Sequence, residues 1–189
     1  MSEKKSALER AAQKLEYGMK TEKEMVRFLM GEGYTASEVA EAVDYLKENN
    51  YINDENYVRM YYMSCRNNNW GEYKILYELE NKGIPKSTAE IIIDDYKESE
   101  DYDGLKDDNA YALRVGMKMA KNQISEGKIM DQQFFGKVGR RLTNLGYRKN
   151  TVYYVISKLK PGSSGGGIGI EELPKDVSEM LAKIKLAQE

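Results

Sequence analysis

The sequence predicts an all-α protein: a tandem array of three three-helix repeats, elongated and curved, with a flexible C-terminal extension. Three observations predict this fold. Apolar residues recur at helical spacing, capping signals precede several of these segments, and one pattern recurs around three glycines. The 189 residues include only three prolines, which also favours helices. Because one small helical repeat buries little apolar surface, neighbouring repeats must stack on one another.

The recurring pattern is centred on Gly33, Gly83 and Gly146. A leucine stands four residues before each glycine, and small, apolar or aromatic residues follow it at five matching positions. Each glycine is predicted to end a helix, and Gly83 is predicted to do so as a left-handed C-terminal cap. The predicted segments are three helical repeats at residues 1–50, 51–98 and 104–160, then a Gly/Ser linker with a C-terminal helix at 161–189.

In the first repeat, the first helix is expected from about Glu3 to Tyr17. Capping boxes begin at Thr21 and at Thr35, each with a glutamate three residues later. In such a box the threonine hydroxyl and the glutamate carboxylate both accept from free backbone N–H groups. The second and third helices should therefore start directly after these threonines.

In the second repeat, Asn53 is a candidate cap for the fourth helix, and Ser87 begins another possible capping box. The third repeat is expected to open with a long helix from Asp107 to about Ile124, and Asp131 should cap the helix after it. Pro174 suits the first turn of a last helix in the C-terminal extension. The fourth helix is expected to bury a stripe made of Tyr57, Met60, Tyr61 and Ser64.

Charge is distributed unevenly along the chain. Residues 32–109 contain eight Lys and Arg against nineteen Asp and Glu, whereas residues 110–160 contain eleven against two. The basic stretch could bind a polyanion such as nucleic acid, or it could be a solvated helix face. The acid-rich middle argues against direct DNA binding. The candidate partner-binding residues are Arg114, Lys118, Lys121, Lys137, Arg140, Arg141, Arg148 and Lys149.

Other functional patterns are weaker. With no histidine and with Cys65 as the single cysteine, His-based metal sites, His-dependent triads and multi-Cys zinc sites are excluded. The pairs Asp94-Asp95 and Asp107-Asp108 could serve acid–base or Mg²⁺ chemistry, but solvated or capping roles are favoured. The tyrosines are expected to pack in the core rather than stack on bases. No enzyme activity, cofactor or membrane span is expected, and the composition fits the cytoplasm.

The stretch from Tyr51 to Ile84 combines a turn, a helix with an aromatic residue and a later arginine, a glycine, and a second helix that ends at a glycine. The residues that carry this pattern are Tyr51, Ile52, Asn53, Asp54, Tyr57, Arg66, Gly71, Ile75, Glu78, Leu79, Lys82, Gly83 and Ile84. In this order and spacing the stretch resembles the central repeat of the RecX family. The family pattern is a Gly-Tyr-Leu/Ile-Asn/Asp-Asp turn, a helix with an aromatic residue and a later arginine, a glycine, and then Ile-x-x-Glu-Leu-x-x-Lys-Gly-Ile. The resemblance covers about Ala7 to Leu159, and the tail after it does not resemble the family.

The resemblance implies a monomeric regulator that binds the RecA filament on single-stranded DNA, along its helical groove. It would modulate, and is expected to inhibit, the ATPase and strand-exchange activities of RecA in DNA repair, recombination and the SOS response. Weak direct DNA contact is compatible with this function. The alternatives are a stand-alone nucleic-acid-binding helical module and an adaptor that binds another protein through the acidic middle.

Overall fold

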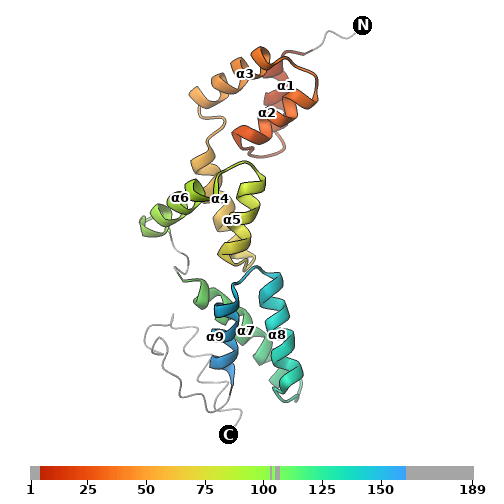
Figure 1. Ribbon diagram of the computed structural model, residues 1–189, viewed down its shortest axis with the longest axis vertical. Helices are drawn as coiled ribbons and strands as arrows, with labels where there is room; N and C mark the ends of the chain where they lie inside the picture. The colour runs from red at the N-terminus through yellow and green to blue at the C-terminus, as the bar shows by residue number, and fades with distance from the viewer. Residues whose placement is uncertain (1–4, 103, 105–106, 161–189) are drawn as a thin grey trace. The chain divides into compact units, whose positions relative to one another are not determined.

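In the computed structural model the described residues are 5–102, 104 and 107–160, and they form nine α-helices and no strand (Figure 1). The all-α prediction is confirmed. No helix in this part of the chain is both long and apolar enough to cross a membrane. The predicted linker and last helix at 161–189 lie outside the described residues. The helices are α1 (Ala7–Leu15), α2 (Glu22–Gly31), α3 (Ala36–Glu48), α4 (Asp54–Asn67), α5 (Glu72–Asn81), α6 (Lys86–Glu98), α7 (Asp108–Ser125), α8 (Gln132–Asn144) and α9 (Lys149–Leu159).

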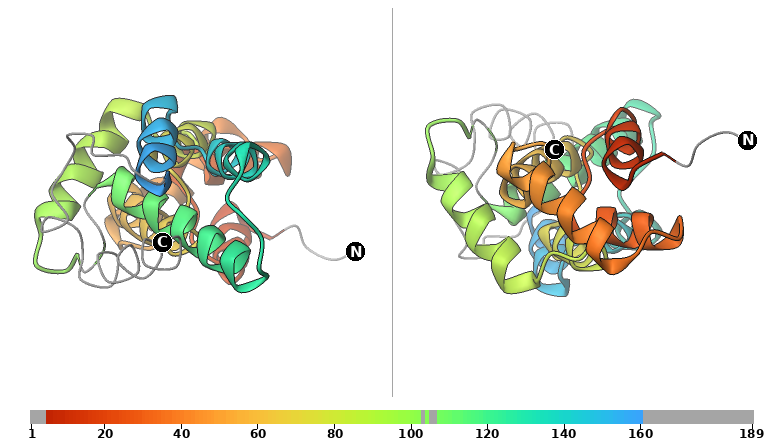
Figure 2. Two further views of the ribbon diagram at one scale, coloured as in Figure 1. Left: turned by 90° about the horizontal axis from the view of Figure 1, so that it is seen from below. Right: turned by 90° about the horizontal axis from the view of Figure 1, so that it is seen from above.

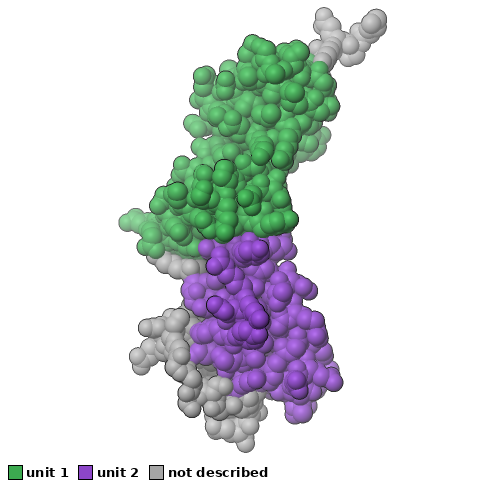
Figure 3. Space-filling model, viewed as in Figure 1, with its two compact units in different colours: residues 1–63, 76–102 green, residues 64–75, 103–189 purple. Residues whose placement is uncertain are grey.

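The chain divides into two compact units (Figure 3). The N-terminal unit comprises residues 1–63 and 76–102, and the C-terminal unit comprises residues 64–75 and 103–189. The division passes through α4 and α5, so each of these helices contributes to both units. This division into two units does not test the three repeats predicted from the sequence, which stay a prediction.

In the N-terminal unit, α1, α2 and α3 pack against one another, and Figure 2 shows their ribbons in red to orange. Their core includes Met25 and Leu29. The prediction that α1 starts at Glu3 is wrong, because Ser6 forms a capping box with Glu9 and starts the helix at Ala7. The hydroxyl of Ser6 accepts from the Glu9 backbone N–H, and the Glu9 carboxylate accepts from the Ser6 backbone N–H. The cap therefore fixes the first residue of the fold's first helix.

The predicted caps of α2, α3 and α8 are confirmed, with Thr21, Thr35 and Asp131 at the capping positions. The capping box predicted at Ser87 is wrong. The helix α6 starts at Lys86, two residues earlier than that box implies, with Pro85 at the cap position and no side-chain cap. Proline already holds its φ near the helical value, so α6 starts without a capping hydroxyl and Ser87 lies inside its first turn.

The three glycines of the repeated pattern end α2, α5 and α8. Gly33, Gly83 and Gly146 have φ values of +83°, +99° and +87°, in the left-handed region. The residue after each glycine donates its backbone N–H to the carbonyl oxygen of the leucine that stands four residues before that glycine. This bond is the one that closes a Schellman motif at a helix C-terminus. These bonds are Tyr34 to Leu29 at 3.3 Å, Ile84 to Leu79 at 3.0 Å and Tyr147 to Leu142 at 3.1 Å. The predicted glycine helix ends are confirmed.

At two of these helix ends, a backbone carbonyl oxygen accepts a hydrogen bond from the start of another helix. In the N-terminal unit, the Thr21 hydroxyl donates to the Lys82 carbonyl oxygen at 2.6 Å, which joins the start of α2 to the end of α5. In the C-terminal unit, the Gly71 N–H donates to the Leu145 carbonyl oxygen at 2.8 Å, which joins the start of α5 to the end of α8. The partial positive end of one helix thus meets the partial negative end of another.

A carboxylate from a later helix also caps the start of an earlier one. Asp54, the first residue of α4, accepts the Glu22 backbone N–H at 2.9 Å. Asp108, the first residue of α7, accepts the Glu72 backbone N–H at 3.2 Å. The same contact therefore recurs at the first residues of α2 and α5.

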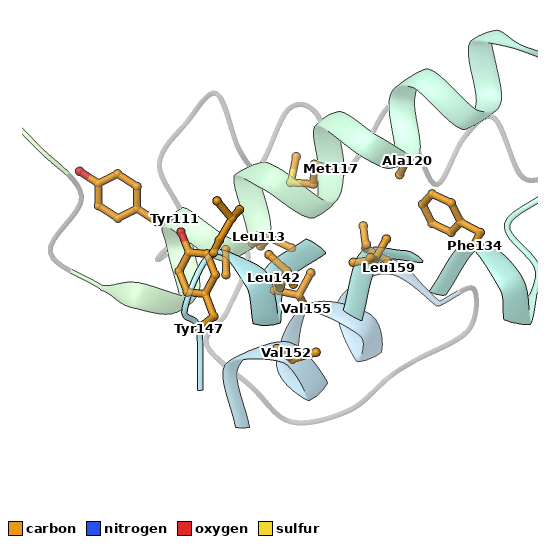
Figure 4. Packing of buried hydrophobic residues seen from close by; sticks show 13 residues of the cluster. Tyr111, Leu113, Met117, Ala120, Phe134, Leu142, Tyr147, Val152, Val155 and Leu159 are labelled. Atoms are coloured by element: carbon orange, nitrogen blue, oxygen red, sulfur yellow. The ribbon is translucent and has the colours of Figure 1, made fainter. Parts of the chain in front are cut away.

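The core of the C-terminal unit lies among α7, α8 and α9, where Met117, Leu142 and Val155 pack together (Figure 4). A Cβ atom added at Gly116 of α7 would lie 2.6 Å from Val155 and 3.1 Å from Leu159. The glycine therefore lets α9 approach α7 closely. This packing fixes the faces that α7 and α8 present to solvent.

Candidate functional site: a basic groove along α7

The eight candidate residues lie on three neighbouring elements of the C-terminal unit. Three are on α7, three are on α8, and two are at the start of α9. All are exposed except Arg114, which is half-buried. Among the described residues, no carboxylate lies within ion-pair distance of any of the eight. Their charges are therefore not neutralised locally.

A groove of about 480 Å³ brings three of the candidates together, namely Arg114, Lys118 and Arg141. We call it the α7 groove. Its lining combines these three cations with apolar side chains, and none of its described lining residues is acidic. Such a surface favours an anionic ligand that also carries apolar groups. The remaining lining residues are Asn69, Val115, Met119, Asn122 and Leu145.

Asn69 fixes one end of the α7 groove. It has a φ of +58° and follows the end of α4. Its carbonyl oxygen accepts from the Tyr147 hydroxyl at 3.0 Å, and its side-chain oxygen accepts from the Arg114 guanidinium at 3.2 Å. Asn69 was not among the site residues predicted from the sequence. The available signal was an asparagine directly before Trp70-Gly71, because asparagine tolerates positive φ at a helix end.

The surroundings of Tyr147 hold its hydroxyl in the donating form. Burial raises the pKa of Tyr147 well above its ordinary value, and the nearby Arg66 charge lowers it by less. Like any tyrosine it is protonated at neutral pH, and the raised pKa keeps the donor to the Asn69 carbonyl oxygen protonated at more alkaline pH as well. The ring of Tyr111 lies 5.1 Å from the Arg114 guanidinium carbon, so Arg114 is supported by an aromatic face as well as by Asn69.

The other five candidates lie outside the groove. Lys121 is one helical turn beyond Lys118 on α7. Lys137 and Arg140 stand four residues and one residue before Arg141 on the exposed side of α8. Two more cations, Arg148 at the cap position and Lys149 as the first residue, lie at the start of α9.

The start of α9 is electrostatically unfavourable in isolation. Cations oppose the positive end of the helix dipole, and Arg148 makes no side-chain cap there. The Nζ atom of Lys149 lies 5.7 Å from the centroid of the Tyr153 ring, and neither cation forms an ion pair among the described residues. A contribution to binding is consistent with this placement.

Chemistry other than binding finds little support in the part of the chain that the structure describes. It contains no cluster of three or more Asp, Glu, His or Cys side chains arranged to hold a metal ion. The Asp107 carboxylate caps α7 by accepting the Asn109 N–H at 3.0 Å, as predicted. Asp108 does more than was predicted, because its carboxylate faces the buried guanidinium of Arg66.

Over the described residues, the chain is an all-helical protein with an exposed basic surface on its C-terminal unit. No protein-family model matches the chain. Similar proteins are known as "Regulatory protein RecX": one from Clostridium beijerinckii, 32% identical over 151 residues (80% of this chain and 67% of that protein), and one from Clostridium perfringens strain 13, 30% identical over 151 residues (72% and 68%). The Clostridium tetani protein of the same name is 32% identical over 146 residues, which cover 77% of this chain and 63% of that protein.

A solved structure also matches in fold. The crystal structure of RecX from Lactobacillus salivarius has a TM-score of 0.64 and 22% sequence identity, over 80% of this chain and 93% of that chain. The chain spans 63% to 68% of the length of the three Clostridium relatives. With 32% identity to a relative of which it covers 67%, this chain belongs to the RecX family.

Proposed function

We propose that this chain is a non-enzymatic cytoplasmic regulator that binds the RecA filament on single-stranded DNA as a monomer. In this proposal it inhibits the ATPase and strand-exchange activities of RecA during DNA repair and recombination. Membership of a family whose proteins are named regulatory proteins supports a regulatory function. The partner itself is inferred from the family resemblance and from the chemistry of the basic surface.

The observation that carries the proposal is the contrast in ion pairing between the eight candidate cations and the other cations of the chain. Among the described residues of the N-terminal unit, six cations pair with a nearby carboxylate, as Arg10 does with Glu32 at 3.0 Å and Lys47 with Glu22 at 2.8 Å. In the C-terminal unit, Arg66 and Lys128 are also paired, whereas the eight candidate cations have no such partner among the described residues. Unpaired cations grouped on neighbouring helices attract an anionic surface, and their attraction weakens with added salt.

Regulation by this surface requires many weak contacts rather than one strong one. Each exposed ion pair contributes about 0.2–1 kcal/mol, so no single cation is expected to control binding. Several such contacts made at once to a repeating partner add up through effective concentration. A regulator bound in this way inhibits by restricting the motions or contacts that the filament needs during strand exchange.

The test is a charge-reversal variant, Lys118→Glu/Arg140→Glu/Arg141→Glu, compared with a control variant, Lys5→Glu/Lys47→Glu/Lys86→Glu. Both variants change the net charge equally, and all six side chains are exposed. Binding to RecA filaments on single-stranded DNA is measured by fluorescence anisotropy at two salt concentrations, and RecA ATPase is measured in parallel. We expect the first variant to bind about tenfold or more weakly at low salt and to lose inhibition, because three contacts reverse sign.

The control variant should bind and inhibit nearly as the parent does. Circular dichroism should show both variants folded. Equal binding by the two variants would contradict the proposal and would leave the basic surface as a solvated face.

A second candidate function, a stand-alone nucleic-acid-binding module, is favoured by the same unpaired cations. It predicts equal affinity for bare single-stranded DNA and for the RecA filament at matched salt, with a steep salt dependence for both. A chain that binds neither target would instead favour an adaptor that contacts another protein through its acidic residues.

A further inference from the structure

The lining of the α7 groove alternates charged and apolar side chains along α7. Arg114 and Lys118 lie one helical turn apart. Val115 and Met119, each next in sequence to one of these cations, also lie one turn apart. Because four residues advance a helix by about 6 Å, a cation and an apolar side chain recur together at about that interval. A ligand that uses the whole groove therefore needs anionic and apolar groups that repeat together at the same interval.

We propose that the α7 groove binds an acidic helical segment of a protein partner, in which a carboxylate and a branched aliphatic side chain recur together every four residues. The carboxylates pair with Arg114, Lys118 and Arg141, and the aliphatic side chains contact Val115 and Met119. The inference rests on the proposed function only for the identity of the partner. It assigns the groove contact to the protein of the RecA filament rather than to its DNA.

The lining suits a nucleic-acid strand less well. Proteins that bind single strands stack the bases on aromatic side chains, and none of the described lining residues is aromatic. The Tyr111 ring beside Arg114 is only 4% exposed, and the Arg66 guanidinium carbon lies 4.3 Å from its centroid, so this ring is too buried to stack on a base. A sugar–phosphate backbone would pair with the cations but would leave Val115 and Met119 without an apolar contact.

The same lining suits a peptide. A methionine side chain is unbranched and flexible, so Met119 can adapt to aliphatic side chains of different shapes. Asn122 supplies an amide that both donates and accepts hydrogen bonds. Asn69 and the Tyr111 ring hold the Arg114 guanidinium in place before a ligand arrives, so less side-chain entropy is lost on binding.

The test is a set of NMR titrations of the full-length ¹⁵N-labelled chain at one salt concentration. The first probe, the Glu-Leu peptide, is a sixteen-residue alanine-based peptide with blocked ends in which a Glu-Leu pair recurs every four residues. Two matched peptides carry serine in place of each leucine or glutamine in place of each glutamate. The fourth probe is a thymidine oligonucleotide with as many negative charges as the Glu-Leu peptide. Half-saturation is measured from the amide signals of Lys118, Met119 and Asn122.

We expect the Glu-Leu peptide to half-saturate these signals at a concentration about tenfold or more below that of the serine peptide and of the oligonucleotide, because it alone satisfies both kinds of lining residue. The glutamine peptide should not shift them. An oligonucleotide that binds as tightly as the Glu-Leu peptide would overturn the proposal in favour of a nucleic-acid site. Equal binding of the Glu-Leu and serine peptides, or no binding of either, would also overturn it. Groove signals that move with protein concentration alone would indicate a second copy of the chain as the occupant instead.

Two variants locate the contact. Met119→Ser should weaken binding of the Glu-Leu peptide about threefold to tenfold and leave binding of the serine peptide unchanged, which a general loss of structure would not do. Lys118→Ala/Arg141→Ala should weaken binding of both peptides. The control Lys5→Ala/Lys86→Ala removes the same charge from exposed positions of the N-terminal unit and should weaken neither. Equal effects of the two double variants would place the peptide outside the groove and overturn the proposal.

Filament binding is measured separately. The Glu-Leu peptide at about ten times its half-saturating concentration should weaken binding of the chain to RecA filaments about tenfold, because it occupies the groove in most molecules. If the peptide binds the groove and filament affinity is unchanged, the peptide site stands and its assignment to the filament fails. If the peptide does not bind while Lys118→Glu/Arg140→Glu/Arg141→Glu still loses filament binding, the proposed function stands and the peptide site fails.

Discussion

The guanidinium of Arg66, which has no exposed surface, lies 2.5 Å from the carboxylate of Asp108, 42 residues further along the chain. Arg66 also donates to the Trp70 carbonyl oxygen at 3.0 Å and stacks 4.3 Å from the Tyr111 ring. The same oxygen of Asp108 accepts the Glu72 backbone N–H. One buried cation therefore ties the end of α4 to the starts of α5 and α7.

Removing the carboxylate should be costly. Asp108→Ala leaves the Arg66 charge buried without its closest counter-charge and removes the acceptor for Glu72, so we expect a loss of about 3–5 kcal/mol in the free energy of unfolding. Urea denaturation followed by circular dichroism measures it. The control is Asp94→Ala, whose side chain is 72% exposed and pairs with Lys97 on the surface. It should change stability by less than about 0.5 kcal/mol, and equal losses would contradict the importance of the buried pair.

Two glycines should respond to alanine with opposite signs. A Cβ at Gly71 would lie 2.5 Å from the Gly146 carbonyl oxygen, a backbone atom that cannot move aside freely. Gly71→Ala should therefore destabilise the chain by about 1–3 kcal/mol. Gly31, the last residue of α2, has no atom within 4 Å of the added Cβ. Gly31→Ala should stabilise the folded chain by up to about 1 kcal/mol, because alanine has the higher helix propensity. The melting temperatures of both variants, compared with that of the parent, test the two signs.

The two capping threonines allow a similar comparison. Thr35 makes only its own capping box, whereas the fully buried Thr21 also donates to the Lys82 carbonyl oxygen. Thr35→Ala should cost about 1 kcal/mol, and Thr21→Ala should cost about 1 kcal/mol more, because a buried acceptor is left without its donor. Thr21→Ser keeps the hydroxyl and should recover most of the difference in urea denaturation. Equal losses of stability in the two alanine variants would show that the hydrogen bond from Thr21 to Lys82 contributes nothing to the free energy of unfolding.

The carboxyl of Asp54 predicts a specific pH dependence. Burial raises the pKa of Asp54, the hydrogen bond from the Glu22 N–H lowers it, and the net shift is upward. A raised pKa in the folded state means that the folded chain binds the proton more readily. This group therefore favours folding most below its ordinary pKa, and that contribution is lost as pH rises through the folded pKa.

Asp54→Asn removes this titration and keeps an oxygen that accepts from Glu22. Relative to the parent, the asparagine variant should gain stability as pH rises between about pH 3.5 and about pH 6. Unfolding free energies of both proteins across this range provide the measurement. A difference that is constant with pH, or that falls as pH rises, would contradict the assignment.

The sequence predicted features that depend on residues close together in the chain. Gly33, Gly83 and Gly146 were predicted as helix ends, and Thr21 and Thr35 as caps, because a cap is decided within four residues. The prediction was wrong where two local signals for a helix start lay close together. Ser87 resembled a cap, but Pro85 had already started α6.

Features that depend on distant residues were not predictable. Met60 and Ser64 were expected in the apolar stripe of α4, yet both are exposed, and Val58 and Tyr62 are buried instead. The burial of Cys65, in contrast, was predicted. Apolar spacing on an aromatic-rich helix fits two faces equally well, and the neighbouring helices decide between them. The α7 groove likewise depends on Asn69, 45 residues before its contact Arg114.

The carboxylates of Asp54 and Asp108 also bear on how a nascent chain gains order. Each accepts a backbone N–H from a helix that was synthesised earlier, 32 residues back for Glu22 and 36 residues back for Glu72. On the ribosome, α2 acquires this acceptor only after Asp54 emerges, and α5 only after Asp108 emerges. Each hydrogen bond closes a loop of only a few dozen residues, so it costs less loop entropy than a contact between the two ends of the chain would. Neither bond requires the C-terminal residues to have been synthesised. The two contacts can thus form one after the other, in the order in which the chain is synthesised from its N-terminus.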